Sequence, residues 1–337
     1  MVLSLSGGLA MDLGTANTLI YEKGRGIILD EPSVVALETD TRRVLAVGQE
    51  AKTYLGRTPV GIEVIRPLKS GVIYDFAVTQ QMIKTFLSLA GAGNRRLFKP
   101  KIVIGVPSCS TQVEKRAIIE AAEQAGGKSI HLVDEPLAAA IGLGLAVADP
   151  VARLVLDVGG GTSEGVVISM GAAAVSESRR VAGDEATLAI IRYLKQKHQL
   201  AVGENMAENI KMTIGSAMPL TETRTFSCRG KDLSRGVPKV VELTDDDIRE
   251  ALADINREFI DLVNRLVSLT PPELAADLTR DGLYLTGGGG LLRGLDQRLA
   301  QETGLKVTVP EEPLKSVALG LGAVLENMGY YRSVFVN

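Results

Sequence analysis

Two glycine-rich turns supply the residue types that bind a metal ion and phosphates. Asp12 begins the first turn, at residues 12–18, and Asp157 begins the second, at residues 157–163; each turn lies between apolar stretches typical of strands. Carboxylates are ligands for hard cations, and glycines let backbone N–H groups approach an anion. Because the two turns lie almost half the chain apart, the sequence predicts a duplicated phosphate clamp.

A third glycine cluster lies late in the chain. Four successive glycines follow Thr286 and a predicted strand: Gly287, Gly288, Gly289 and Gly290. Their backbone offers a flat surface without side chains, on which a planar base or a phosphate could lie near the N-terminus of a helix predicted at 291–303. Taken alone, the cluster indicates a tight turn. Together with the two aspartate turns, it indicates a nucleotide site.

The composition favours a globular protein with about two domains. The 337 residues are 45% hydrophobic and 23% charged, and the lack of Trp with only 4% aromatic residues predicts aliphatic cores, as in helix-covered sheets. A net charge of -3 provides no basic field, so nucleic acid is not an expected partner. Cys109 and Cys228 lack metal-ligand spacing and imply no disulfide framework, which favours the reduced cytoplasm.

No apolar stretch reaches the roughly 18 residues that a membrane-spanning helix needs, and the N-terminus lacks the features of a signal peptide. We therefore expect neither secretion nor a transmembrane segment. Residues 2–11 carry several large apolar side chains. They predict a lead-in to the first strand; a short membrane-touching segment is the alternative, although Gly7 and Gly8 disfavour a helix there.

The predicted elements use one module twice. Strands at 9–12, 17–22, 26–30 and 33–38 form a meander, and strands at 154–157, 164–170 and 172–182 repeat it. Further strands are expected at 101–106, 130–133, 225–228, 238–243, 282–286 and 305–309. A helix is expected to begin at the capping box of residues 111–114 and to end at the glycines 126–127, and another is expected to begin at Pro136. Further helices are expected at 77–90, 184–198, 204–215, 245–268, 291–303 and 315–328.

Residues 127–129, Gly-Lys-Ser, match only the end of a P-loop. Ala122 stands where the first glycine of that motif is required, and here a helix precedes and a strand follows. We therefore interpret the glycines as the end of the helix. No Gly-x-Gly-x-x-Gly follows a strand and opens a helix, so a dinucleotide fold has no support.

The order of these motifs resembles that of the actin, Hsp70 and sugar kinase superfamily and, within it, the MreB family of bacterial actins. The resemblance covers essentially the whole chain. It is carried by the Asp12 turn, Val106-Pro107-Ser108, Asp134-Glu135-Pro136, the Asp157 turn and the Thr286 glycine cluster, and by the MreB-like segments 17–21 (NTLIY), 31–36 (EPSVVA), 65–67 (IRP), 71–73 (GVI), 270–274 (TPPEL) and 291–296 (LLRGLD).

The resemblance implies an actin-like α/β fold, in which two duplicated ribonuclease H-like domains surround a nucleotide cleft and each carries a smaller subdomain. Domain I is expected at 1–146 and 315–337, with its small subdomain at about 33–75. Domain II is expected at 147–314, with its small subdomain at about 184–244.

The resemblance also assigns an ATP and Mg²⁺ site. Asp12 and Asp157 would hold a hydrated Mg²⁺ ion that bridges the phosphates. Backbone N–H groups would surround the phosphates from the first turn, at Gly14, Thr15, Ala16 and Asn17, and from the second, at Gly159, Gly160, Gly161 and Thr162. Glu135, fixed by Pro136, would orient the attacking water with help from Thr162; the alternative is a carboxylate that only stabilises a helix N-terminus.

Three charged residues are expected near the nucleoside. Glu208 and Lys211 lie three apart, so they share a helix face. By resemblance they border the ribose and adenine, with Gly287–Gly290 opposite, and a plain surface ion pair is the alternative. Asp184 also matches a family position near the nucleotide.

Three departures from the family pattern concern the second half of this site. Ser163 stands where a second Thr is common, Gly165 where Val is common, and Ala186-Thr187 where Met-Asp is common. Glycine within a strand weakens packing. We therefore expect Gly165 to loosen the second turn and to affect the hydrolysis rate rather than nucleotide binding.

Residues 94–100 place Leu97 and Phe98 among Arg95, Arg96 and Lys99. Apolar side chains flanked by cations suit an anionic bilayer, and the MreB resemblance implies membrane contact at this loop. The alternative is a loop folded back on the core.

The resemblance implies a slow cytoskeletal ATPase that organises wall synthesis in rod-shaped bacteria. It would polymerise with itself head to tail and form the antiparallel pairs typical of this family, at the inner face of the cytoplasmic membrane, with the elongation proteins MreC, RodZ and RodA as partners. A metabolic kinase would need an acceptor pocket, and an Hsp70-type chaperone would need a peptide-binding domain; the sequence indicates neither. A nucleotide-locked scaffold with little turnover remains an alternative.

Overall fold

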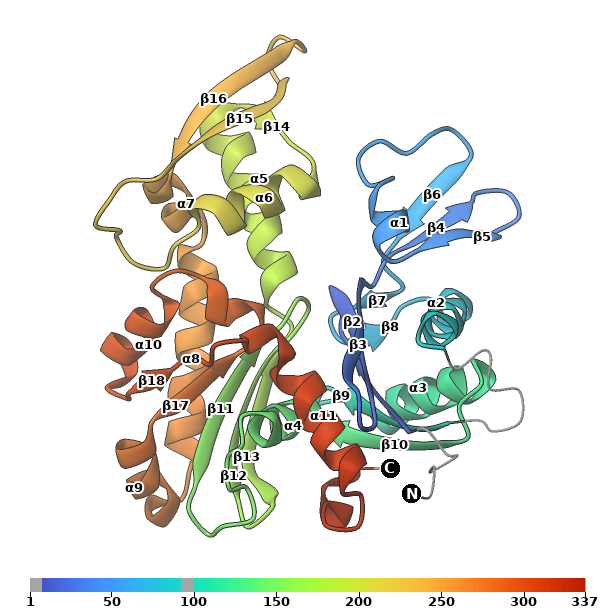
Figure 1. Ribbon diagram of the computed structural model, residues 1–337. Coiled ribbons are helices and arrows are strands. Elements are labelled where there is room, and N and C mark those ends of the chain that lie inside the picture. The colour runs from blue at the N-terminus through green and yellow to red at the C-terminus, as the bar shows by residue number, and fades with distance from the viewer. Residues whose placement is uncertain (1–7, 92–99, 337) are drawn as a thin grey trace.

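The computed structural model describes residues 8–91 and 100–336 (Figure 1). Within them, two five-stranded sheets have the same topology. The first has the order β10-β9-β1-β2-β3, from β1 (Leu9–Leu13), β2 (Asn17–Glu22), β3 (Gly26–Pro32), β9 (Lys101–Val106) and β10 (Ser129–Asp134). The second has the order β13-β12-β11-β17-β18, from β11 (Arg153–Val158), β12 (Ser163–Ser169), β13 (Ala172–Arg179), β17 (Leu283–Thr286) and β18 (Val307–Thr308).

Each sheet begins as an antiparallel meander of three strands and continues with two parallel strands. This shared pattern confirms the predicted use of one module twice. It also places the turn after β1 and the turn after β11 at equivalent points of the two sheets. The two actin-like domains of the sequence prediction are therefore built around these sheets, while the exact domain boundaries stay a prediction.

Smaller sheets form the upper arms in Figure 1. One has the order β5-β4-β6, from β4 (Val35–Glu38), β5 (Val44–Val47) and β6 (Ile62–Ile65), beside α1 (Gln49–Lys52). The other has the order β14-β15-β16, from β14 (Leu200–Ala201), β15 (Thr225–Asp232) and β16 (Pro238–Thr244). The prediction that 33–38 continues the first meander is wrong. The meander ends at Pro32, after which the chain turns into β4 of the separate sheet.

Most helices lie where they are expected. They are α2 (Phe76–Leu89), α3 (Gln112–Gln124), α4 (Glu135–Gly142), α5 (Gly183–His198), α6 (Glu204–Ile214), α7 (Asp245–Ala251), α8 (Ala253–Leu269), α9 (Pro272–Asp281), α10 (Leu295–Thr303) and α11 (Ser316–Glu326). Thr111 and Glu114 form the predicted capping box of α3. Residues 125–128 connect α3 to β10, and Ser129 begins that strand, so the Gly-Lys-Ser segment follows a helix and leads into a strand, which confirms that it is not a P-loop.

Two helix predictions need correction. The helix expected at 245–268 is two helices, because Leu252, with φ -94° and ψ 0°, ends α7 and precedes α8. The helix expected at 291–303 begins only at Leu295, because Gly294 adopts a left-handed conformation with φ +73°. The glycine cluster before it forms a short 3₁₀ turn, Gly288–Leu291. Helix α9 was not expected.

One hydrophobic core joins the two sheets. It contains Val103 and Val133 of the first sheet, Val155 and Val166 of the second, and the apolar side of α4 and α11. In Figure 1 these two helices lie together between the sheets. The turns that carry the candidate site therefore project from sheets packed through a common core.

We expect Gly320→Val to destabilise the protein strongly, because α4 and α11 cross at glycines. A Cβ on Gly320 would lie 1.7 Å from the Ala138 carbonyl oxygen, and one on Gly142 would lie 2.0 Å from that of Ser316. A valine would force the helices apart, at a cost of about 3 kcal/mol, measurable as a lower urea midpoint. The control is Gly329→Ala, since nothing lies within 4 Å of that position. Equal midpoints for the two variants would contradict this packing.

Candidate functional site

The two glycine turns face each other across the boundary between the sheets. A Cβ added to Gly160 would lie 2.9 Å from Cβ of Ala16, and one added to Gly161 would lie 2.6 Å from Oγ1 of Thr15. Only glycine permits such an approach of one backbone turn to another. The structure thus brings the two turns together, as the duplicated clamp requires.

Asp12 and Asp157 lie at the ends of β1 and β11, next to these turns. The Thr286 hydroxyl donates a hydrogen bond of 2.9 Å to Oδ1 of Asp157. Burial, followed by the negative charges of Asp157 and Asp30, raises the pKa of Asp12 to about 7. Burial raises the pKa of Asp157 to about 6, although the Thr286 bond opposes this shift. A bound cation would relieve the repulsion between the two carboxylates.

This pair fits Mg²⁺ better than a metal held entirely by protein. Among the residues that the structure describes, no three His, Cys, Asp or Glu side chains converge into a metal cage. Mg²⁺ usually takes one or two carboxylates and completes its shell with water and phosphate oxygens. Asp12 and Asp157 are suited to that arrangement.

Glu135 is the first residue of α4, directly after β10. Its side chain lies over Gly105 of β9, where an added Cβ would be 3.2 Å from Cγ of Glu135. Burial raises the pKa of Glu135 well above its usual value, and the charges of Glu164, Asp12 and Asp157 add to the rise. The carboxyl is therefore close to the other acidic groups of the site.

Glu164 is a site residue that the sequence prediction missed. It is only 1% exposed, and its Oε2 accepts the backbone N–H of Ser108 at 3.1 Å. Burial raises the pKa of Glu164 to about 7, the Ser108 bond opposes the rise, and Asp157 adds to it. Strand alternation could have found Glu164, because it lies two residues beyond Thr162 and opposite Asp157.

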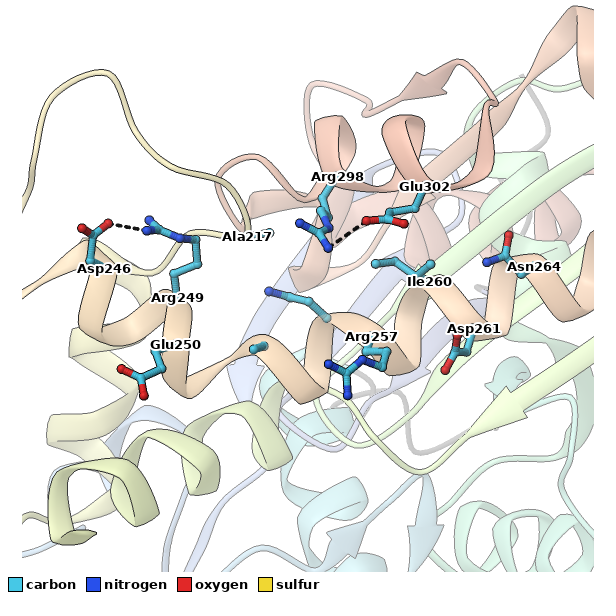
Figure 2. Close-up of a pocket in the computed structure, with 12 residues that line it drawn as sticks. Ala217, Asp246, Arg249, Glu250, Arg257, Ile260, Asp261, Asn264, Arg298 and Glu302 are labelled. Atoms are coloured by element: carbon cyan, nitrogen blue, oxygen red, sulfur yellow. Dashed lines mark hydrogen bonds and ion pairs between the residues drawn. The ribbon is translucent and has the colours of Figure 1, made fainter. Parts of the chain in front are cut away.

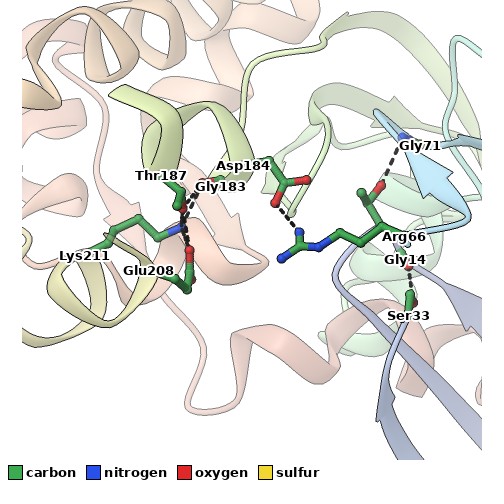
Figure 3. A network of polar contacts seen from close by, with 10 residues as sticks. Gly14, Ser33, Arg66, Gly71, Gly183, Asp184, Thr187, Glu208 and Lys211 are labelled. Atoms are coloured by element: carbon green, nitrogen blue, oxygen red, sulfur yellow. Dashed lines mark hydrogen bonds and ion pairs between the residues drawn. The ribbon is translucent and has the colours of Figure 1, made fainter. Parts of the chain in front are cut away.

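Side-chain hydrogen bonds hold the first turn in place. The Ser33 hydroxyl donates to the carbonyl of Gly14 at 2.6 Å, and Gly71 N–H donates to Oγ1 of Thr15 at 3.1 Å (Figure 3). The Asn17 side chain donates to Asp30 of the neighbouring strand β3 at 2.9 Å. Asn17 can therefore offer its backbone, rather than this amide, to a phosphate.

Glu208 and Lys211 belong to a network between α5 and α6, not to an isolated surface ion pair (Figure 3). Nζ of Lys211 lies 2.7 Å from Oε2 of Glu208 and donates to the Gly183 carbonyl at 2.8 Å. The Thr187 hydroxyl donates a hydrogen bond of 2.5 Å to Oε2 of Glu208 and accepts one of 3.0 Å from Nζ of Lys211. The departure at Thr187 thus supplies a hydroxyl that links the two charged residues.

Asp184 pairs with Arg66, which the sequence prediction left without a role. Oδ1 of Asp184 lies 2.8 Å from Nη1 of Arg66, an ion pair between residues 118 positions apart (Figure 3). Asp184 also donates its backbone N–H to the Gly160 carbonyl at 2.8 Å. Burial raises the pKa of Asp184, and the Arg66 charge opposes the rise. Asp184 therefore lies beside the second turn.

The late glycine cluster packs against the end of β11. A Cβ on Gly289 would lie 2.4 Å from Cβ of Val158, and Gly287, with φ +72°, donates its N–H to the Pro313 carbonyl at 3.0 Å. Thr286 connects the cluster to Asp157. The structure thus brings the third glycine motif next to the second turn.

Gly165 does not loosen the second turn in the way expected from its lack of a side chain. A Cβ at this position would lie 2.1 Å from Cδ1 of Leu266 on α8. Leu266 is fully buried, so its side chain fills the space above the glycine. The strand is therefore packed at Gly165 by the helix instead of by its own side chain.

A pocket of about 490 Å³ lies elsewhere, between α7, α8 and α10 (Figure 2). Its walls are strongly charged and include the pairs Asp246–Arg249 and Arg298–Glu302. None of the predicted nucleotide residues lines it. The pocket is therefore separate from the candidate site.

Leu97, Phe98 and the first part of segment 2–11 lie outside the described residues. The predicted membrane contacts at these positions stay predictions. Among the helices that the structure describes, none is long and apolar enough to cross a membrane.

The fold and the paired aspartate turns define an actin-like protein. The chain is similar to the crystal structure of MreB5 of Spiroplasma citri bound to ADP, with a TM-score of 0.91, 30% identity and 98% of each chain covered. It shares its fold with a MamK double helical filament, at a TM-score of 0.81 and 21% identity over 95% of this chain and 99% of the other.

The chain belongs to the MreB/Mbl protein family, whose model matches residues 6–333. It is 46% identical over 325 residues to the cell shape-determining protein MreB of Escherichia coli (strain K12), covering 95% of this chain and 94% of that protein. It is 44% identical over 321 residues to the cell shape-determining protein Mbl of Bacillus subtilis (strain 168), covering 95% and 96%. The resemblance predicted from the motifs is confirmed.

Proposed function

We propose that the protein binds ATP with Mg²⁺ between its two aspartate turns, hydrolyses it slowly, and polymerises in response. The observation that carries this proposal is the approach of the two turns, with Gly160 against Ala16 and one carboxylate beside each turn. The similar MreB5 of Spiroplasma citri was crystallised with ADP and with AMPPNP, which supports a nucleotide as the ligand.

The site residues have distinct roles in this proposal. Backbone N–H groups of both turns bind the phosphates, and Asp12 and Asp157 hold the metal. When bound, Mg²⁺ would neutralise negative charge on the phosphate oxygens. Glu135 accepts a hydrogen bond from the attacking water and orients it, with help from Thr162. Orienting a water requires little basicity, so turnover is slow.

The two turns also explain how a nucleotide could control assembly. They belong to different sheets, so a ligand that binds both favours the conformation in which the sheets are close. Subunits in that conformation would stack head to tail, a heterologous contact that produces filaments, and filaments would pair in antiparallel fashion. Hydrolysis removes the terminal phosphate contact and weakens the polymer.

Sedimentation of the purified protein tests this function. With ATP and Mg²⁺ we expect polymer in the pellet and slow release of phosphate; with ADP or with EDTA we expect less polymer. Sedimenting polymer without phosphate release would favour the nucleotide-locked scaffold. A monomer that transfers phosphate to a small molecule would contradict the filament proposal.

We further propose that the filament lies on the inner face of the cytoplasmic membrane and organises wall synthesis with MreC, RodZ and RodA. The support is the family membership together with the apolar and basic sequence at 94–100. Each loop would bind weakly, but a filament presents many loops in a row, so attachment would depend on polymerisation.

Replacing Leu97 and Phe98 together by Ser should weaken binding to phosphatidylglycerol-containing vesicles more than tenfold. Each large apolar side chain contributes roughly 1.5–3 kcal/mol when it is buried. Co-sedimentation with vesicles measures the effect, and polymer formation without vesicles should not change. Val60→Ser, at a fully exposed apolar residue, is the control. Unchanged vesicle binding in the double variant would exclude this loop and direct attention to residues 2–11.

A further inference from the structure

Glu164 is a buried carboxylate to which the proposed chemistry gives no role. It lies on β12, and its residue is 1% exposed. In the sheet register it stands directly opposite Asp157 on β11. Opposite residues of an antiparallel pair project from the same face of the sheet. Glu164 therefore lies on the same face of the second sheet as the candidate metal ligand.

The Glu164 carboxylate connects the two sheets. Its Oε2 accepts the N–H of Ser108 at 3.1 Å, and the Ser108 hydroxyl lies 3.5 Å from the same atom. Sγ of Cys109 lies 3.9 Å from Oε1. Ser108 and Cys109 follow β9 of the first sheet, whereas Glu164 belongs to the second. A buried carboxylate needs hydrogen bonds, so this contact restricts where the 107–109 loop can lie.

The 107–109 loop is next to the residues proposed to handle the attacking water. Strands β9 and β10 are parallel neighbours with Val106 opposite Asp134. The 107–109 loop and Glu135 therefore follow the carboxyl ends of two adjacent strands, on the same side of the sheet. Glu164 is also the neighbouring charge that contributes most to the raised pKa of Glu135, after burial. The two carboxyl groups are therefore close in space.

Thr162 and Pro107 both lie next to Gly71. A Cβ on Gly71 would lie 2.7 Å from Cγ of Pro107 and 3.1 Å from Cγ2 of Thr162. The backbone at Gly71 therefore contacts both Pro107 of the loop and Thr162 of the second turn. A shift of the 107–109 loop would thus change the surroundings of Thr162 and Glu135 together.

We propose that Glu164 is a positioning residue: through its bond to Ser108 N–H it fixes the 107–109 loop against the second turn and thereby sets the separation of Glu135 and Thr162. This inference rests on the proposed ATPase function. Glu164 contacts neither water nor phosphate in this role; it acts through the loop. Small errors in the placement of reacting groups are costly to rate, while nucleotide affinity depends on other contacts.

The test compares Glu164→Ala, which removes the acceptor, with Glu164→Gln, which keeps an oxygen for Ser108 N–H. In the nucleotide-free protein we expect Glu164→Ala to speed amide hydrogen exchange of Ser108 about tenfold, because a hydrogen bond to a charged group is lost. At saturating ATP it should release phosphate about tenfold more slowly, with the ATP Kd changed less than about threefold. Glu164→Gln should stay within about threefold of wild type in all measurements.

Glu120→Ala on α3, at a half-exposed side chain, is the matched control, with no expected effect. Wild-type turnover in Glu164→Ala would overturn the proposal. Equal slowing in Glu164→Gln would also overturn it, because the charge itself would then act rather than the bond to Ser108. A wild-type protein without phosphate release would instead contradict the ATPase function. The exchange rate of Ser108 in Glu164→Ala would still show whether Glu164 fixes the loop, and an unchanged rate would overturn that role.

Discussion

Replacing Asp12 by Asn should make the nucleotide-free protein more stable at pH 8 while it weakens metal-dependent nucleotide binding at least tenfold. Asp12 has an ordinary pKa of 3.8 when unfolded and a pKa of about 7 in the folded protein, because of burial and the nearby Asp157 and Asp30. The folded state therefore holds the proton more tightly than the unfolded state. Ionising Asp12 at higher pH consequently costs folding free energy.

The pH window follows from these two pKa values. Between about pH 4 and 7 the unfolded protein has lost the Asp12 proton and the folded protein retains it, so the stability of the wild type falls as the pH rises. At pH 8 the cost is on the order of 2–4 kcal/mol, since each pKa unit corresponds to about 1.4 kcal/mol. An uncharged Asn avoids this cost, so the advantage of Asp12→Asn should be larger at pH 8 than at pH 5.

Two measurements check the Asp12 prediction. Urea unfolding in EDTA should show a higher midpoint for Asp12→Asn than for wild type, whereas Asp40→Asn, at an exposed loop residue, should leave the midpoint unchanged. Nucleotide titration with Mg²⁺ should show at least a tenfold loss of affinity in Asp12→Asn, with little loss in EDTA. A destabilised variant with normal Mg²⁺ dependence would show that Asp12 has a structural role instead.

The two turns could be predicted because their information is local. Aspartate, glycine and threonine in one short segment between apolar strands determine both the turn and its chemistry. The repetition of this segment predicted the duplicated sheets that the structure confirms. In contrast, the strands β5 and β6 were not predicted, since they are short and only partly buried and so lack a clear alternating pattern.

Contacts between distant segments were not predictable from the same signals. Arg66 and Asp184 are 118 residues apart, and nothing near either one indicates its partner. Glu164 and Ser108 meet only because the two sheets pack through a shared core. The prediction that Gly165 weakens the packing of its strand was wrong for the same reason. The missing side chain would leave a gap beside the strand, but Leu266 of α8 fills that space. The chemistry of the turns is local, while the positions of Glu135 and Glu164 relative to them depend on tertiary packing.

Glu135→Gln should lower the rate of phosphate release by about 100-fold while ATP still binds and the protein still polymerises. The substitution removes the carboxylate that is proposed to orient the attacking water, and such groups contribute about 10² to 10⁴ in rate. The side chain keeps its shape, so its packing over Gly105 is preserved. The substitution removes the negative charge of Glu135, which lies near the carboxylates of Asp12, Asp157 and Glu164. Because these groups repel the charge of Glu135, its loss should not weaken ATP binding.

Filament lifetime distinguishes this role from a purely structural one. If hydrolysis weakens the polymer, Glu135→Gln filaments assembled with ATP should persist after wild-type filaments have disassembled, and both proteins should pellet equally at early times. Glu120→Gln, at a half-exposed carboxylate on α3 that pairs with Arg116, should behave as wild type. Normal phosphate release in Glu135→Gln would show that Glu135 only stabilises the start of α4, and the water would then have to be oriented by another group. Slow release with filaments that still disassemble at the wild-type rate would separate hydrolysis from disassembly and contradict the proposed use of ATP as a timer.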